Sequence, residues 1–186
     1  IMAYTTINKS TDYFNTKLYT GNGAASHAIT GVGFQPDFTW IKRRNTTYDH
    51  ALFDAVRGVE KMLISNTTAA QNNQSNGVKA FGTDGFTVGD FSAGNINNST
   101  YASWNWKAAT YGATYYSKVE GGTQSNSDTA YAIGITAGSN GSNTWRVAVN
   151  RDSGFSIVKY VGTGSNATVG HGLGVAPKMI IFKNLN

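Results

Sequence analysis

Side chains able to do acid–base chemistry are sparse in this 186-residue chain, which contains ten acidic residues and three histidines. One acid–imidazole cluster is present, where Asp49 and His50 are adjacent and Asp54 follows in the same segment. Such a cluster can form part of a proton relay, but no serine stands in the sharp strand-to-helix turn that activates a hydrolase nucleophile. We therefore predict no catalytic residue at this cluster.

Two pairs of carboxylates could flank a glycosidic bond, as a glycosidase requires. They are Asp54 with Glu60, and Asp84 with Asp90. Because acidic residues beside turns usually bond to turn backbone, we interpret both pairs as turn residues. Asp84 and Asp90 could supply isolated oxygen ligands, but the chain has no calcium-loop spacing. The sequence thus predicts no catalytic residue, no metal site and no cofactor, and a polysaccharide-degrading enzyme is the least favoured function.

Aromatic rings and side-chain amides, the groups that grip sugars, are better represented, since 12% of the residues are aromatic. Two polar loops, residues 66–77 and 90–99, are long enough to suggest a role beyond connecting strands. The alternative is that they form ordinary loop surface. The residues predicted as possible contacts to a glycan or a host surface are Tyr48, Asn72, Asn73, Asn95 and Asn97.

The composition is that of an all-β protein with polar, weakly charged faces. Charged residues make up 13% of the chain, the net charge is +5, and 22 residues are glycine. Residues 42–44 (KRR) form the densest positive cluster, which we interpret as a solvated strand end rather than a polyanion site. There is no cysteine, no signal-peptide pattern and no apolar run of about 18 residues. We therefore expect no disulfide, no nucleic-acid partner and no membrane insertion.

A stretch near the start of the chain recurs near its end at a constant offset of 141 residues (160 − 19). YTGNGAASHAITGVGFQPDFTWIK at residues 19–42 aligns without a gap with YVGTGSNATVGHGLGVAPKMIIFK at residues 160–183. Both prolines of the chain occupy one equivalent position, so we predict a true internal repeat with one conformation. The repeated turn residues are Gly21, Gly23, Gly31, Gly33 and Pro36 in the first copy and Gly162, Gly164, Gly172, Gly174 and Pro177 in the second.

The repeated unit is predicted to run as strand, glycine turn, strand, Gly-x-Gly turn, proline and buried strand. Glycine suits turns that need positive φ or close backbone approach, and proline can open a strand without removing a needed donor. The apolar runs 38–41 and 179–182 are accordingly predicted as strands. If the chain ends at Asn186, the second run is expected to pair with the first sandwich or with a neighbouring subunit, because an unpaired apolar strand aggregates.

Residues 101–106 (YASWNW) alternate between two faces, and the two tryptophans share one of them. We interpret the tryptophan face as the core side, with a binding platform as the alternative. This pattern, with the absence of helical periodicity, predicts an antiparallel β-sandwich. The predicted core residues are Leu18, Phe38, Trp40, Leu52, Leu63, Phe86, Trp104 and Trp106.

Four segments follow from these patterns. Residues 1–15 are predicted as an N-terminal arm and residues 16–109 as the β-sandwich. Residues 110–153, with glycine- and serine-rich turns, are predicted as an added β-meander. Residues 154–186 are either the start of a second repeat copy or the closing strands of the first sandwich.

Five motifs in a fixed order resemble a known domain family. They are YTGNG…ITGVGFQPDFTWIKRRN, DHALFDAVRGVEKMLISNTTAA, FGTDGFTVG, YASWNWKAA and GFSIVKYVGTGSNATVGHGLGVAPKMIIFKN. Over residues 13–109 and 154–186 the chain resembles a domain that recurs, often in tandem, in virion structural and tail proteins of tailed bacteriophages, many of them marine. The resemblance implies a concanavalin-like, jelly-roll sandwich and brings no catalytic residue with it.

The resemblance also implies a function, a location and partners. It implies a non-enzymatic virion structural protein, such as a tail-fibre, tail-associated or surface-decoration subunit, assembled in the host cytoplasm. The expected partners are other copies of itself, in a homo-oligomer, and other virion proteins. The alternative is a carbohydrate-binding, lectin-like module that attaches the particle to a host surface glycan.

Overall fold

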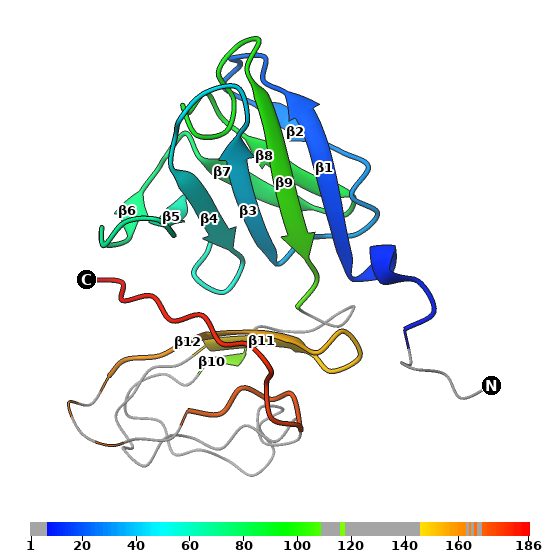
Figure 1. Ribbon diagram of the computed structural model, residues 1–186, viewed down its shortest axis with the longest axis vertical. Helices are drawn as coiled ribbons and strands as arrows, with labels where there is room; N and C mark the ends of the chain where they lie inside the picture. The colour runs from blue at the N-terminus through cyan, green and yellow to red at the C-terminus, as the bar shows by residue number, and fades with distance from the viewer. Residues whose placement is uncertain (1–6, 109–115, 118–145, 163, 165, 167–168) are drawn as a thin grey trace. The chain divides into compact units, whose positions relative to one another are not determined.

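The computed structural model describes residues 7–108, 116–117, 146–162, 164, 166 and 169–186 (Figure 1). The described part is all-β apart from one short 3-10 helix, and every strand pair is antiparallel, which confirms the predicted fold class. No helix in these ranges is long and apolar enough to cross a membrane. The elements are η1 (Ser10–Asp12), β1 (Phe14–Thr20), β2 (His27–Ile29), β3 (Phe38–Arg43), β4 (His50–Asp54), β5 (Lys61–Ile64), β6 (Asn72–Asn73), β7 (Val78–Gly82), β8 (Gly85–Val88), β9 (Thr100–Trp106), β10 (Tyr116–Ser117), β11 (Arg146–Asn150) and β12 (Phe155–Lys159).

The chain divides into two compact units, one containing the chain up to Lys107 together with Ile181–Asn186, and the other containing Ala108–Ile180. The first unit has a six-stranded sheet in the order β1-β9-β3-β4-β5-β6 and a three-stranded sheet in the order β2-β8-β7. Figure 1 shows the smaller sheet behind the larger one, so the two layers form a sandwich. The second unit has the sheet β10-β11-β12. Most of the meander predicted over residues 110–153 lies outside the described residues.

The sandwich core lies between the two sheets. Ile41 and Phe53, both 0% exposed, extend from the large sheet and share one hydrophobic cluster with Phe86 and Val88 of β8. Tyr101 on β9 is also fully buried in this cluster. Burial of such side chains is the main stabilising contribution to a β-sandwich.

The outer face of the six-stranded sheet carries most of the side chains that the sequence assigned to the core. Trp40 lies opposite Trp104, and both Phe14 and Phe38 lie opposite Trp106. The ring centroids of Phe14 and Trp106 are 4.8 Å apart. We call this set the aromatic face, and its members are Phe14, Leu18, Phe38, Trp40, Trp104 and Trp106.

The core prediction is therefore wrong for five residues, Leu18, Phe38, Trp40, Trp104 and Trp106. Leu18 is 57% exposed, and the other four side chains are partly buried on the outer face. Leu52 and Leu63 are buried, but the register places them on the same outer face, and Phe86 alone of the predicted set lies in the core cluster. Alternation along β9 was predicted correctly, but the small sheet covers the face of Tyr101, Ser103 and Asn105 instead.

The internal repeat is visible in the strands and turns of both copies. β1 starts at Phe14, inside the predicted arm, and β12 starts at Phe155, which is 141 residues later (155 − 14). The φ angles of the first-copy glycines Gly23, Gly31 and Gly33 are 67°, 80° and 90°. Their counterparts Gly164, Gly172 and Gly174 have φ angles of 72°, 74° and 77°. The turn geometry that the repeat predicts thus recurs.

The predicted strand over residues 179–182 is not formed, and Met179 and Phe182 are 76% and 74% exposed. In the first copy β1 and β3 do not pair with each other, because β9 lies between them. β3 pairs with β9 on one side and with β4 on the other. β12, the counterpart of β1, pairs with β11. β11 therefore lies beside β12 as β9 lies beside β1, but no strand in the described part of the chain pairs with residues 179–182.

Candidate functional site

A cavity of about 260 Å³ lies in the first compact unit. It forms where the start of β4 and the end of β5 meet the loops that precede β7 and follow β8. The apolar residues that line it include Met62, Ile64 and Phe91. The polar residues that line it are Tyr48, Asp49, His50, Gln74, Asn76, Asp90 and Ser92.

Backbone hydrogen bonds fix the loops around this pocket. The Gly89 amide donates to the Gly77 carbonyl at 2.9 Å, which joins the two loops at the end of the β7–β8 hairpin. The Tyr101 hydroxyl donates to the Ser92 carbonyl at 3.2 Å and accepts from the Ile96 amide at 2.9 Å. A buried core tyrosine therefore holds one wall of the pocket in place.

Most of the polar side chains that line the pocket are uncommitted. Within the described part of the chain, the side chains of five lining residues make no hydrogen bond: Tyr48, Gln74, Asn76, Asp90 and Ser92. The Asp49 carboxylate accepts one bond, from Asn66 Nδ2 at 2.7 Å. A small polar ligand requires free hydrogen-bond donors and acceptors together with some apolar contacts, and the lining residues supply both.

His50 lines the pocket, but its ring lies on the opposite face of β4. Its Nδ1 accepts a hydrogen bond from Trp40 Nε1 at 2.8 Å, and the rings of His50 and Trp40 meet edge-on. Burial, together with the Lys42 ammonium, lowers the pKa of the imidazole, although Asp49 opposes this. Asp49 bonds to Asn66 instead, so the acid–imidazole cluster of the sequence does not form a relay.

The five predicted glycan-contact residues lie in different places. Tyr48 lines the pocket and is 41% exposed. Asn72 and Asn73 form β6, where the Asn73 amide oxygen accepts from Lys61 Nζ at 2.6 Å, and neither lines the pocket. Asn97 is exposed beside Gly23, also away from the pocket.

Asn95 is 0% exposed, so its prediction as a surface contact is wrong. Its Oδ1 accepts from the Asn22 amide at 2.9 Å, and its Nδ2 donates to the Ala24 carbonyl at 2.9 Å. The Gly23 amide donates to the Asn95 carbonyl at 2.9 Å. Asn95 therefore holds the repeated glycine turn against the loop before β9.

Sequence patterns did not single out Gln74, Asn76 or Ser92, and they marked Asp90 only as a candidate carboxylate or cation ligand, although all four lie in the two long polar loops. A usable signal was present. The residues before β7 and after β8 must lie at the same end of one hairpin, because the two strands are antiparallel.

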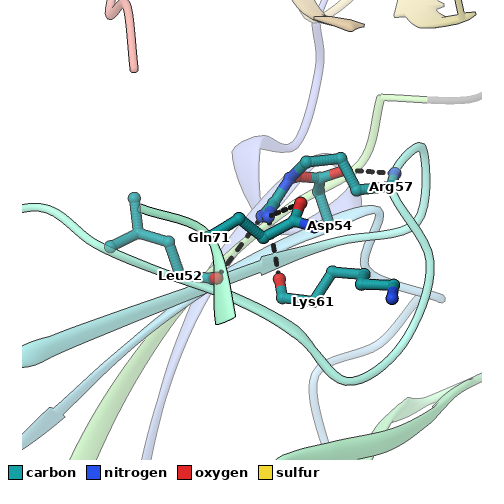
Figure 2. Close-up of polar contacts among 5 residues, drawn as sticks. All are labelled: Leu52, Asp54, Arg57, Lys61 and Gln71. Atoms are coloured by element: carbon teal, nitrogen blue, oxygen red, sulfur yellow. Dashed lines mark hydrogen bonds and ion pairs between the residues drawn. The ribbon is translucent and has the colours of Figure 1, made fainter. Parts of the chain in front are cut away.

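A buried ion pair shapes the β4–β5 connection, at the other end of β4 from the pocket (Figure 2). Arg57 Nε lies 2.6 Å from Asp54 Oδ2, and each side chain is only 5% exposed. Arg57 Nη1 also donates to the Lys61 carbonyl at 2.9 Å and to Gln71 Oε1 at 3.1 Å. The guanidinium thus joins the end of β4, the start of β5 and the segment before β6. Asp54 is a structural residue, and it does not pair with Glu60, whose Oε1 lies 3.4 Å from Lys79 Nζ.

Asp84 has a different structural role in the first repeat copy. Its carboxylate accepts hydrogen bonds from the amides of Gly31 and Gly33 at 2.9 Å and 2.7 Å. These bonds hold the pKa of the Asp84 carboxyl below its ordinary value. Asp84 and Asp90 therefore serve different parts of the sandwich, and the two do not form a carboxylate pair across a cleft.

Replacing Asp84 by asparagine is expected to destabilise the sandwich at pH 7 and to matter less in acid. A carboxyl with a lowered folded-state pKa stabilises the fold above its unfolded pKa, and that contribution is lost as pH falls below about 4. Urea midpoints of the two proteins at pH 7 and pH 3 measure the difference. Asp12→Asn, at an exposed helix position, is the matched control, and an Asp84→Asn deficit that is equal at both pH values would contradict the prediction.

Within the described ranges, no three histidine, aspartate or glutamate side chains gather where they could hold a metal ion. No curated protein and no solved structure is significantly similar to the chain. A family model described as "Domain of unknown function (DUF7483)" matches residues 9–186, a span that includes the sandwich, the pocket and both repeat copies. On this match, the chain belongs to the DUF7483 family.

Proposed function

We propose that this chain is a non-enzymatic structural protein of a tailed-bacteriophage virion, in which copies assemble with each other and with other virion proteins. A tail-fibre, tail-associated or surface-decoration subunit fits equally well. The five ordered motifs and the weakly charged β composition support this role. The observation that carries it is the unpaired apolar run at the end of the second repeat copy.

The side chains of this run, and Val175 before it, are largely exposed, and adjoining exposed apolar side chains mark interaction sites. The exposed fractions are 71% at Val175, 76% at Met179, 61% at Ile180, 62% at Ile181 and 74% at Phe182. The counterpart of residues 179–182 in the first copy is β3, which is paired on both sides. An extended segment with unpaired backbone groups and apolar side chains tends to form hydrogen bonds with another strand. The run is therefore suited to pairing with a further strand, which in our proposal a neighbouring subunit supplies.

Three further positions of the second copy support the same conclusion. A side chain at Gly21 would overlap the backbone of Asn95 and Ile96, whereas one at Gly162 would meet nothing within 4 Å. The amides of Gly31 and Gly33 donate to Asp84, but no described residue accepts from those of Gly172 and Gly174. Among the described residues, none fills the places in the second copy that loop residues fill in the first.

Replacing both Met179 and Ile181 by aspartate is expected to suppress self-association. Two charges would oppose burial of the run in any strand interface. Light scattering coupled to size exclusion, from micromolar to millimolar protein, should show a mass that rises with concentration for the parent chain and stays monomeric for the variant. Val169→Asp, at a position 37% exposed outside the run, is the control that should leave association unchanged. A parent chain that stays monomeric throughout would contradict the assembly role.

The place of the protein in the particle requires a separate measurement. Mass spectrometry of purified particles of the phage that encodes the chain should detect it in fixed stoichiometry. A reconstruction of the particle should then show the two-layered sandwich. Particles that lack the chain would contradict the virion role even if the isolated protein self-associates.

A carbohydrate-binding, lectin-like role in host attachment is the second candidate. It is favoured because Tyr48 and parts of both long polar loops meet at one pocket. The two roles are compatible, because a structural subunit can also carry a receptor site.

A further inference from the structure

The pocket has an acidic lining, although the whole chain has a net charge of +5. The carboxylates of Asp49 and Asp90 both belong to residues that line it. One oxygen of the Asp49 carboxylate accepts a hydrogen bond from Asn66 Nδ2. The Asp90 carboxylate accepts no hydrogen bond from any described residue. Two carboxylates at one small cavity repel an anionic ligand and accept hydrogen bonds strongly from hydroxyl groups.

The nearby cations do not offset this charge inside the pocket. Lys42 Nζ donates to the Tyr48 carbonyl at 2.8 Å and does not line the cavity. Lys79 Nζ donates to the Ser75 carbonyl at 2.6 Å and lies 3.4 Å from Glu60 Oε1. Both ammonium groups therefore have partners outside the cavity.

His50 adds no positive charge to the site at neutral pH. Its ring lies on the aromatic face, where Nδ1 accepts the Trp40 indole hydrogen. Burial and the Lys42 ammonium lower the pKa of the imidazole, which favours its neutral form, although Asp49 opposes this. The charge that a ligand meets in the pocket is thus set by the two aspartates.

The size and the apolar parts of the pocket restrict the ligand further. A volume of about 260 Å³ is slightly below the range for drug-sized ligands, which begins at about 300 Å³. Tyr48, 41% exposed, offers an aromatic ring to the C–H face of a sugar, and Met62 and Phe91 add apolar lining. The amides of Gln74 and Asn76 supply donors and acceptors for hydroxyl groups.

We infer that this pocket binds a single sugar residue without a carboxylate, a neutral hexose or an N-acetylhexosamine, and discriminates against uronic acids. The inference rests on the carbohydrate-binding candidate and adds the class of sugar to it. Tyr48 supports the ring of the sugar, and Asp90 accepts its hydroxyl hydrogens. The charge of Asp90, together with that of Asp49, rejects the uronate.

Matched sugar pairs test this inference on the full chain. The pairs are glucose with glucuronate, galactose with galacturonate, and mannose with mannuronate, with N-acetylglucosamine as a further probe. Backbone amide chemical shifts during titration report both affinity and location. At least one neutral sugar should bind and shift the amides of residues 74–76 and 90–93. Its uronate partner should bind about fivefold more weakly or worse, because of charge repulsion.

Two substitutions separate charge from packing. Asp90→Asn should weaken binding of the neutral sugar and reduce the difference in affinity between that sugar and its uronate. A merely structural defect would weaken both sugars and leave that difference unchanged. Tyr48→Ala should lower the affinity for the neutral sugar by about tenfold, as expected for loss of one ring contact. Tyr160→Ala, at a tyrosine 40% exposed in the other unit, and Asp12→Asn are the matched controls and should leave binding unchanged.

The possible failures are distinguishable. A uronate that binds as tightly as its neutral partner overturns the sugar class but leaves carbohydrate binding intact. Sugar binding that neither Tyr48→Ala nor Asp90→Asn weakens overturns this pocket as the site. If no sugar of either kind shifts any amide, the inference and the carbohydrate-binding candidate are both overturned, and the virion role is then judged by the association and particle measurements.

Discussion

Replacing Arg57 by alanine is expected to lower the free energy of unfolding of the sandwich by about 3–5 kcal/mol, because removing one partner leaves a buried charge uncompensated. The Arg57 and Asp54 side chains are each 5% exposed, so water screens the pair little. The substitution also leaves Gln71 Oε1 and the Lys61 carbonyl without the guanidinium donor. Urea unfolding followed by tryptophan fluorescence measures the effect.

The control for this prediction is the exposed pair of Lys79 and Glu60, whose side chains are 39% and 40% exposed. Lys79→Ala should cost less than about 1 kcal/mol, since exposed ion pairs contribute little. The double variant Asp54→Ala with Arg57→Ala should be more stable than the sum of the two single effects implies, because both buried charges are gone. An Arg57→Ala effect as small as that of Lys79→Ala would show that the buried pair does not hold the β4–β5 connection.

Replacing Phe53 by alanine is expected to destabilise the sandwich by about 3–5 kcal/mol, through lost burial and the cavity that remains. Phe53 is 0% exposed and packs edge-on against Phe91, with ring centroids 5.8 Å apart. Because Phe91 lines the pocket, the same substitution should also lower the affinity of the pocket for any ligand that it binds. Urea unfolding measures the stability loss directly.

Leu18→Ala is the informative comparison for Phe53, because the sequence pattern placed Leu18 in the core. Leu18 is 57% exposed on the aromatic face, so its truncation should change the free energy of unfolding by less than about 0.5 kcal/mol. If Leu18→Ala and Phe53→Ala cost the same, then the assignment of inner and outer faces of the six-stranded sheet is wrong.

Local patterns in the sequence were enough for the strands at residues 38–41 and 101–106 and for the repeated turns. Gly31 and Gly33 adopt positive φ, as do Gly172 and Gly174, because turn conformation depends on a few adjacent residues. The alternation of residues 101–106 likewise follows from the geometry of a single strand. These features could be predicted because they do not depend on distant parts of the chain.

The faces of the sheet could not be assigned in this way. Both faces of β9 carry large side chains, Tyr101 on one and Trp104 on the other. The position of the β2-β8-β7 sheet decides which face is buried, and that sheet is built from residues far from β9 in the sequence. For the same reason the apolar run at residues 179–182 has the sequence of a strand without forming one, because a strand requires partners as well as propensity.

The candidate site likewise has features that the sequence predicts and features that depend on the tertiary structure. The sequence by itself determined that Tyr48 and two polar loops offer the groups that a sugar needs, because residue type sets hydrogen-bonding and stacking capacity. It did not distinguish Asn95, whose side-chain amide bonds to the turn at residues 22–24, from Asp90, whose carboxylate accepts no hydrogen bond from any described residue and belongs to the pocket lining. Only the tertiary structure decided this, because a polar side chain serves the fold or a ligand according to which backbone groups the packing of the two sheets brings within hydrogen-bond distance.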